Sequence, residues 1–179
     1  VLDRLAPIVA ELAHVTGETV IIGKMQGDIV TYLDVVPGTH TVRYTASPGD
    51  TFPTHTSAIG KSTLSLLAED ALERAISQLT FVPLTGATIV DPAVLKADIL
   101  AGKERGYQLV RGENVVDVTG ISTSHLIGGE PYAIGVAGPA GRMEENLEPY
   151  VAALWEAGTA IGTLATLHLP SPAQAGRGR

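Results

Sequence analysis

Residues 49–61 read Gly-Asp-Thr-Phe-Pro-Thr-His-Thr-Ser-Ala-Ile-Gly-Lys, a loop marked by glycine and proline that leads into a helix from about Ser57. Gly and Pro interrupt regular structure, whereas apolar residues after Ser57 recur at helical spacing. The first backbone N–H groups of a helix have no partner inside it, so Ala58, Ile59 and Gly60 offer donors to an anion. The stretch therefore predicts a binding site at a loop-to-helix junction.

The residues before this stretch predict one helix and three strands. Residues 2–16 carry apolar side chains at three- and four-residue spacings and end at Gly17, as an amphipathic helix does. Three β-branched stretches follow at 19–23, 29–36 and 40–46, with turn residues between them. We expect these three stretches to form an antiparallel meander.

The residues after this stretch predict further helices and a buried pair of strands. A short helix is expected from Glu69, and a longer one from Asp91 to Gly106, where Asp can cap the helix and Pro92 can occupy its first position. The expected strands are 107–110, 115–126 and 131–137, the last two joined by a hairpin at Gly128-Gly129.

The end of the chain predicts a long helix and a tail. Apolar residues from Met143 to Leu167 keep a helical period, and this helix is expected to pack on the helix at 2–16. Residues 169–179 are mostly Pro, Ala, Gly and Arg and are expected to be a disordered tail. The sequence therefore predicts one α+β domain over residues 1–168.

Composition excludes several function classes for this chain. Among its 179 residues, 12 Lys and Arg stand against 19 Asp and Glu, a net charge of −7, so no basic surface for nucleic acid is expected. There is no cysteine, which excludes disulfides and thiolate metal sites. No apolar run approaches the roughly 20 residues of a membrane span. We expect the chain to be cytoplasmic. Because Val1 is not an initiator methionine, we also expect the chain to begin within a longer protein.

Motifs for catalysis, metals and cofactors are weak. Gly60-Lys61-Ser62 ends like a phosphate-binding loop, but His55 stands where that motif requires glycine. The five histidines lack metal-ligand spacing, so neither a metal nor a cofactor is expected. The only plausible catalytic groups for an enzyme are His55 with Ser122 or Ser124. Small residues around Gly120 and Gly135 either leave room for a ligand or allow helices to approach closely.

Three segments resemble one protein family. Residues 49–61 are similar to the pattern G-x-x-x-P-x-H-x-x-A-x-G-K in the effector-binding domain of IclR-family transcriptional regulators. Arg105-Gly106-Tyr107 and residues 134–142, Ile-Gly-Val-Ala-Gly-Pro-Ala-Gly-Arg, also resemble family segments in order and spacing. The resemblance covers about residues 1–168.

The resemblance implies a GAF-like domain with a curved antiparallel sheet around a small-molecule pocket. It also implies a homodimer or homotetramer that contacts DNA only through an N-terminal winged helix-turn-helix absent from this chain, and no contact with a membrane. Asp117 and Ser124 depart from the pattern, since many members have glycine and proline there.

Pocket positions carried over from the family are mostly small or apolar here. The complete expected set is Tyr44, Phe52, Ala58, Ile59, Val110, Gly120, Gly135 and Ala137. The last four of these stand where a member that binds small keto acids has polar side chains. Burying ligand oxygens without partners is costly, so the effector is expected to be a less polar carboxylate with an aromatic or medium-chain body.

The resemblance favours ligand-controlled transcriptional regulation, without catalysis, over two alternatives. One alternative is an enzyme that uses the same pocket, and the other is a purely structural oligomerisation module formed by the first and last helices. The sequence does not name the effector or distinguish a repressor from an activator.

Overall fold

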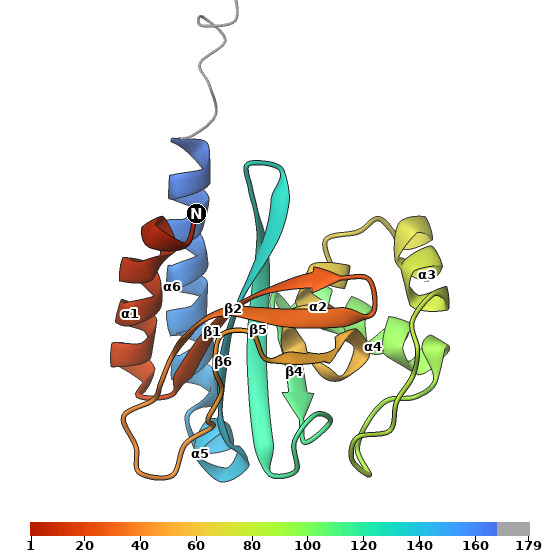
Figure 1. The fold of residues 1–179 in the computed structure, drawn as a ribbon, viewed down its shortest axis with the longest axis horizontal. Helices are drawn as coiled ribbons and strands as arrows, with labels where there is room; N and C mark the ends of the chain where they lie inside the picture. The colour runs from red at the N-terminus through yellow and green to blue at the C-terminus, as the bar shows by residue number, and fades with distance from the viewer. Residues whose placement is uncertain (168–179) are drawn as a thin grey trace, which may run out of the picture.

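The computed structural model describes residues 1–167, so the tail expected at 169–179 lies outside the described residues. A single antiparallel sheet with strand order β3-β2-β1-β6-β5-β4 forms the centre of the fold and curls strongly (Figure 1). The strands are β1 Thr19–Gln26, β2 Ile29–Val36, β3 Thr51–Pro53, β4 Gln108–Arg111, β5 Val118–Ile127 and β6 Glu130–Pro139. The glycines of the β5–β6 hairpin, Gly128 and Gly129, both have positive φ, as such a turn requires.

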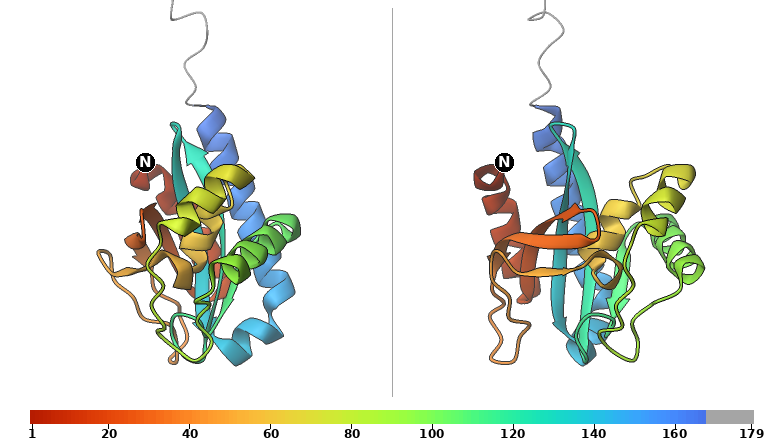
Figure 2. Two further views of the ribbon diagram at one scale, coloured as in Figure 1. Left: turned by 90° about the vertical axis from the view of Figure 1, so that its right-hand side faces the viewer. Right: turned by 45° about the vertical axis from the view of Figure 1, so that its right-hand side comes forward.

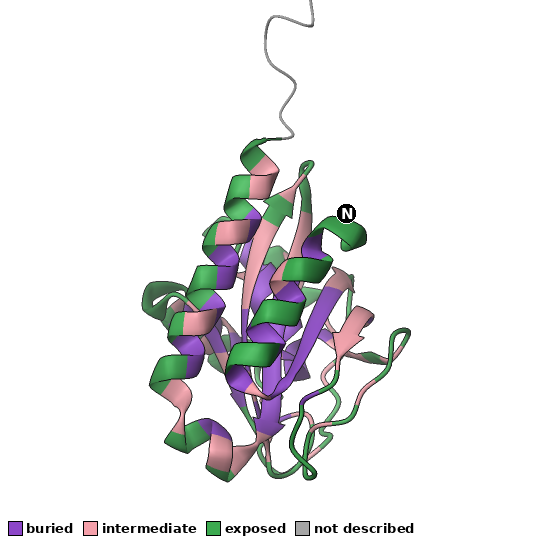
Figure 3. Ribbon diagram, turned by 90° about the vertical axis from the view of Figure 1, so that its left-hand side faces the viewer, coloured by how far each residue is buried: buried purple, intermediate pink, exposed green. Residues whose placement is uncertain are grey.

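One face of the sheet is covered by two long helices. Helices α1 (Leu2–Thr16) and α6 (Leu147–Thr166) lie side by side, with their buried residues toward the sheet and their exposed residues outward (Figure 3). Their apolar residues join Val20, Ile22 and Ile134 of the strands in the largest core cluster. The predicted packing of the first helix on the last is confirmed.

The other face of the sheet holds the helices between residues 54 and 105 (Figure 2). A 3₁₀ turn at Thr54–Thr56 leads into α2 (Ala58–Leu64), which packs on the sheet through Ile59. Outside it lie α3 (Glu69–Ser77) and α4 (Pro92–Arg105), which share a core with Leu64 of α2. Helix α4 begins as predicted, because the Asp91 side chain accepts hydrogen bonds from the N–H groups of Ala93 and Val94.

The third strand expected at 40–46 is wrong. This stretch is irregular, and the strand that pairs with β2 is β3. Side chains from other elements bind the backbone of the stretch: the Tyr44 carbonyl accepts from Thr19 Oγ1, and the Val42 carbonyl accepts from Arg142. Because these carbonyls are already paired, the β-branched composition of the stretch does not lead to strand pairing.

The single helix expected from Met143 is also wrong, since the structure has two helices. α5 (Ala140–Glu145) ends at Asn146, where α6 begins. The Asn146 backbone N–H and side-chain Nδ2 both donate to the Arg142 carbonyl, at 3.2 and 2.8 Å, and this double contact closes α5. Within residues 1–167 no helix combines the length and the apolar character needed to cross a membrane. The α+β class with an antiparallel sheet is confirmed.

Candidate functional site

A cavity of about 440 Å³, its open mouth included, lies between the concave face of the sheet and the start of α2. Strands β1, β2, β5 and β6 form its floor, and the loops at 37–50 and 112–117 close its sides. Most of its walls are apolar, contributed by residues such as Ile21, Ile59 and Val118. An apolar wall with a few polar groups is typical of a small-molecule site.

Most of the positions expected from sequence meet at this cavity. Seven line it directly: Tyr44, Ala58, Ile59, Val110, Gly120, Gly135 and Ala137. The eighth, Phe52, does not line it. Its ring packs on Tyr32, a lining residue, with 5.1 Å between the ring centroids, so Phe52 supports the wall from behind.

The two lining glycines have different roles. A Cβ on Gly135 would lie 3.0 Å from Cδ1 of Ile59, so this glycine allows α2 to approach β6 closely. A Cβ on Gly120 would lie 3.7 Å from the Cβ of Ala58, an ordinary contact, so the space at Gly120 belongs to the cavity. Each of the two interpretations left open by the sequence therefore applies to one glycine.

Polar groups at the cavity come from residues that sequence reasoning missed. Ser57 is 3 % exposed and lines the cavity, yet within the described residues its hydroxyl has no hydrogen-bond partner. Asn114 Oδ1 accepts from Thr56 Oγ1 at 3.3 Å, and no acceptor for Asn114 Nδ2 lies in residues 1–167. Ser57 immediately precedes α2, a position that could have been recognised from sequence as a helix N-cap.

Lys61 fixes the loop that carries Asn114. Its side chain is fully buried, and Nζ donates to Asp98 of α4 at 2.6 Å and to Glu113 at 2.7 Å. A buried cation is stable only with such partners. Lys61 therefore joins α2, α4 and the loop at 112–117. The glycine before it, Gly60, has no room for a side chain, because a Cβ there would lie 2.2 Å from the Thr54 carbonyl oxygen.

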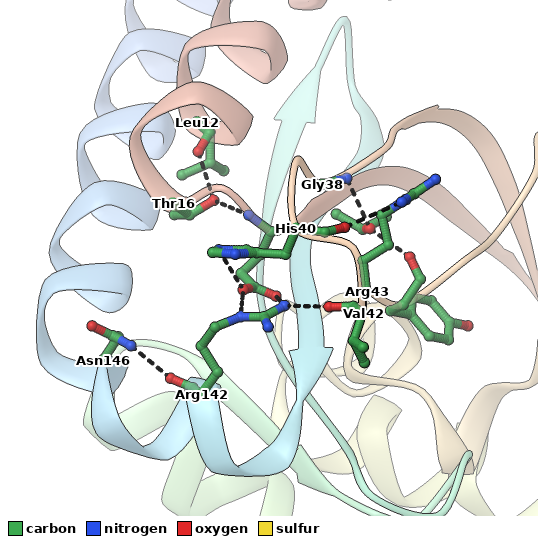
Figure 4. A network of polar contacts seen from close by, with 11 residues as sticks. Leu12, Thr16, Gly38, His40, Val42, Arg43, Arg142 and Asn146 are labelled. Atoms are coloured by element: carbon green, nitrogen blue, oxygen red, sulfur yellow. Dashed lines mark hydrogen bonds and ion pairs between the residues drawn. The ribbon is translucent and has the colours of Figure 1, made fainter.

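The loop that carries Tyr44 is held by a second buried charge (Figure 4). Glu18 is fully buried and accepts from the Nε and Nη2 atoms of Arg142, while His40 Nε2 lies 3.7 Å from the same carboxylate. Arg142 also donates to the Val42 carbonyl at 2.8 Å. This network pins the loop at 37–50 over the end of the sheet and so places Tyr44 at the cavity.

Burial keeps the tyrosines at the cavity protonated. The hydroxyls of Tyr32 and Tyr44 lie 3.3 Å apart, and burial raises the pKa of both phenols above its ordinary value. Both hydroxyls are therefore neutral at physiological pH. Since no charged side chain lines the cavity among the described residues, its polar groups are neutral hydroxyls and an amide.

The residues of the enzyme alternative lie in different surroundings. His55 Nε2 accepts from the Val82 N–H at 3.0 Å, and burial lowers the pKa of this imidazole. Ser122 and Ser124 instead lie within 2.9 and 2.8 Å of Ser62 Oγ. His55 thus holds the loop at 80–90 and does not contact either serine. Among residues 1–167 no cluster of three His, Cys, Asp or Glu side chains could hold a metal.

Comparisons with known proteins agree on one family. The family model described as bacterial transcriptional regulator IclR C-terminal matches residues 1–163. The HTH-type transcriptional regulator BhcR of Paracoccus denitrificans is 32% identical over 145 residues, 80% of this chain and 52% of that protein. The HTH-type transcriptional repressor AllR of Escherichia coli is 30% identical over 148 residues, 82% of this chain and 55% of that protein. The chain thus spans about half the length of these relatives.

Solved structures show the same fold. The IclR protein of Thermotoga maritima superposes with a TM-score of 0.84 at 25% identity, covering 91% of this chain and 67% of that one. The C-terminal domain of the Escherichia coli regulator KdgR superposes with a TM-score of 0.78 at 23% identity, covering 89% of this chain and 94% of that one.

Proposed function

Because the chain belongs to the IclR family of bacterial transcriptional regulators, as its C-terminal domain, we propose that it is an effector sensor that binds a small organic carboxylate in the cavity under α2. The observation that carries the proposal is the Ser57 hydroxyl, which lines an apolar cavity and makes no hydrogen bond within the described residues. A free hydroxyl in an apolar cavity can donate to a bound acceptor, and such a bond is stronger there than in water.

The polar end of the cavity suits the carboxylate. Ser57 Oγ and Asn114 Nδ2 can both donate to its oxygens, beside the first N–H groups of α2. The rest of the ligand would lie against Ile59, Val110 and Val118, which favour an aliphatic or aromatic body over further polar groups. The effector class proposed is therefore a monocarboxylate with an apolar or aromatic body.

The bound effector would act through the assembly of a longer protein. In this proposal the chain forms homodimers or homotetramers, and effector binding favours one arrangement of subunits, which sets the positions of N-terminal DNA-binding domains on an operator. The site of action would be the cytoplasm. Either repression or activation follows, according to which arrangement binds DNA more tightly.

The test is a thermal-shift and calorimetric screen of the purified chain against aliphatic and aromatic monocarboxylates, with mass analysis of each hit. Saturating a native-state site at a hundredfold excess over Kd adds about 2.7 kcal/mol of stability. We expect Ala58→Trp to abolish binding by filling the cavity, and Ser57→Ala to weaken it about tenfold. Circular dichroism and sedimentation check that both variants keep their fold and oligomeric state.

The matched control is Ser77→Ala, which removes an exposed hydroxyl at the end of α3 that is distant from the cavity lining. It should leave effector affinity unchanged. Unaltered affinity in Ala58→Trp would overturn the site. No binding across the panel would favour the structural module, and a consumed ligand would favour the enzyme.

A further inference from the structure

A second hollow lies at the opposite edge of the sheet from β3, next to β4. It encloses about 1020 Å³ including its opening, and its walls come from the end of α2, from α4, from β5 and from α6. None of its lining residues lines the cavity under α2. We refer to it below as the β5 groove.

The β5 groove exists because β4 is short. β4 pairs with β5 only between Thr119 and Ser122, whereas β5 continues to Ile127. Among the described residues no strand covers this side of β5 beyond Ser122. The space that a longer β4 would fill stays open between α2 on one face and α6 on the other.

A cluster of hydroxyls forms one wall of the groove, and its hydrogens are all used internally. Ser62 Oγ and Thr63 Oγ1 both donate to the Ile59 carbonyl at 3.0 Å. Ser122 Oγ and Ser124 Oγ lie 2.9 and 2.8 Å from Ser62 Oγ. Because the Ser62 hydroxyl hydrogen already goes to the Ile59 carbonyl, Ser62 Oγ accepts from Ser122 and Ser124. Ser122 is fully buried, whereas Ser124 is half-buried, so the lone pairs of Ser124 make this wall an acceptor for a ligand.

A further acceptor lies at the end of the groove. Gln108 is 2 % exposed, and its Nε2 donates to the Ile99 carbonyl at 2.9 Å, but within residues 1–167 its Oε1 has no hydrogen-bond partner. This oxygen lies against Gly102, where a Cβ would come within 2.3 Å of it. Gln108 and Gly102 both line the groove. An unsatisfied buried carbonyl of this kind indicates a missing donor.

The opposite wall is aromatic. Trp155 of α6 is 48% exposed, and its indole is held in place because Nε1 donates to the Gly106 carbonyl at 3.0 Å. The Tyr107 ring meets it edge-on. The electron-rich face of an indole packs well on the C–H face of a saturated ring. Lys103 contributes a positive charge to the groove, and among residues 1–167 no carboxylate lines it, so a cationic ligand is disfavoured.

We propose that the β5 groove is a second binding site, specific for a neutral molecule rich in hydroxyl groups, such as a monosaccharide or a cyclitol. One of its hydroxyl groups would donate to Ser124 Oγ, and its ring would pack on Trp155. The site is independent of the carboxylate cavity, so the chain would respond to two classes of compound.

The single tryptophan of the chain makes the test direct, since fluorescence excited in tryptophan comes from Trp155 alone. The probes are D-glucose and myo-inositol, titrated into the purified chain. We expect a saturable change in emission, and no saturable change with permethylated glucose, which keeps the ring but has no donors. Calorimetry with the same probes should give the same Kd.

Two variants complete the experiment. Ser124→Ala removes one acceptor and should weaken binding about tenfold. Thr159→Arg, at an exposed position of α6 that lines the groove, should block the groove without disturbing the core. Ala58→Trp would add a second fluorophore, so Ala58→Leu serves as the cavity control and should leave probe affinity unchanged. Three outcomes would overturn the proposal. They are an equal emission change with permethylated glucose, no saturation with D-glucose or myo-inositol, and wild-type affinity for the probes in Thr159→Arg.

Discussion

Glu18 and Arg142 lie 124 positions apart in the sequence, and their side chains form a two-contact ion pair whose carboxylate is completely buried. The pair joins the start of β1 to α5 and holds the loop at 37–50 through the Val42 carbonyl. Glu18 also explains Gly138 of β6, because a Cβ there would lie 1.9 Å from Glu18 Oε2.

Replacing Arg142 tests how much this ion pair contributes to the free energy of unfolding. Arg142→Ala leaves a buried carboxylate without its partner, and we expect a loss of about 3 kcal/mol in the free energy of unfolding, measured by urea denaturation. The control is Arg111→Ala, which breaks an exposed pair with Glu144 and should cost less than about 1 kcal/mol. Similar losses in both variants would show that burial of Glu18 is not the source of the effect.

A second prediction concerns Lys61. Lys61→Met leaves Asp98 and Glu113 without their shared cation, so the variant should be less stable than the wild type at neutral pH. Burial already raises the pKa of Glu113, and loss of the cation raises it further. A raised carboxyl pKa in the folded state means that the fold gains stability as the group is protonated. The deficit should therefore shrink between pH 7.5, about three units above the ordinary pKa of a Glu carboxyl, and pH 5, which lies near that pKa.

Urea denaturation of both proteins at the two pH values gives this deficit directly. Lys96→Met removes a cation that pairs with exposed Glu69 and Glu73, and its deficit should be small and nearly independent of pH in this range. A Lys61→Met deficit that grows on acidification would contradict the proposed cause.

Two histidines with lowered pKa values predict how the wild-type protein responds to acid. Burial lowers the pKa of both His55 and His125 below the ordinary value of 6.5. Between that value and the lower folded-state pKa, the unfolded chain binds protons that the folded chain does not, so stability must fall as pH decreases below 6.5. Replacing His125 by Gln should make this fall shallower in urea titrations across that range. His14→Gln, at an exposed position in α1, controls for the loss of a histidine.

Glycine substitutions test the approach of α2 to the 3₁₀ turn before it. Gly60→Ala must place a Cβ 2.2 Å from the Thr54 carbonyl oxygen, and we expect a loss of about 1–3 kcal/mol, the range for overpacking a core. Gly162→Ala in α6 meets nothing within 4 Å and should raise stability by up to about 1 kcal/mol, because alanine favours a helix. A tolerated Gly60→Ala would mean that the turn can move away from α2.

The fold was predictable where local chemistry decides it. Asp91 caps α4 because its carboxylate can reach two backbone N–H groups of the next turn, which depends on a few neighbouring residues only. The stretch at 40–46 could not be predicted in this way, because Arg142 binds its backbone from 100 positions away. β3 is three residues long and ends in Pro53, so it carries almost no periodic signal.

In the candidate site, too, some residues could be predicted from the sequence and others could not. Family resemblance indicated seven positions that line the cavity, six of them in helices or strands and one, Tyr44, in the irregular loop at 37–50. The side chains with free hydrogen-bonding capacity, Ser57 and Asn114, depend on how two loops are anchored. For Asn114 that anchor is Lys61, whose burial could not be inferred from a sequence in which lysine is ordinarily exposed.

Strand β6 separates the cavity from the α1–α6 helix pair by the thickness of one backbone. Its side chains alternate, so Ala133 and Ala137 face the side of α2 while Ile134 and Val136 join the core under α1 and α6. A substitution at Ala137 therefore changes the wall of the cavity, and one at Ile134 changes the core on which α1 and α6 pack. Because neighbouring residues of this ten-residue strand face opposite sides, the cavity wall and the helix-packing core can each be changed without altering the other.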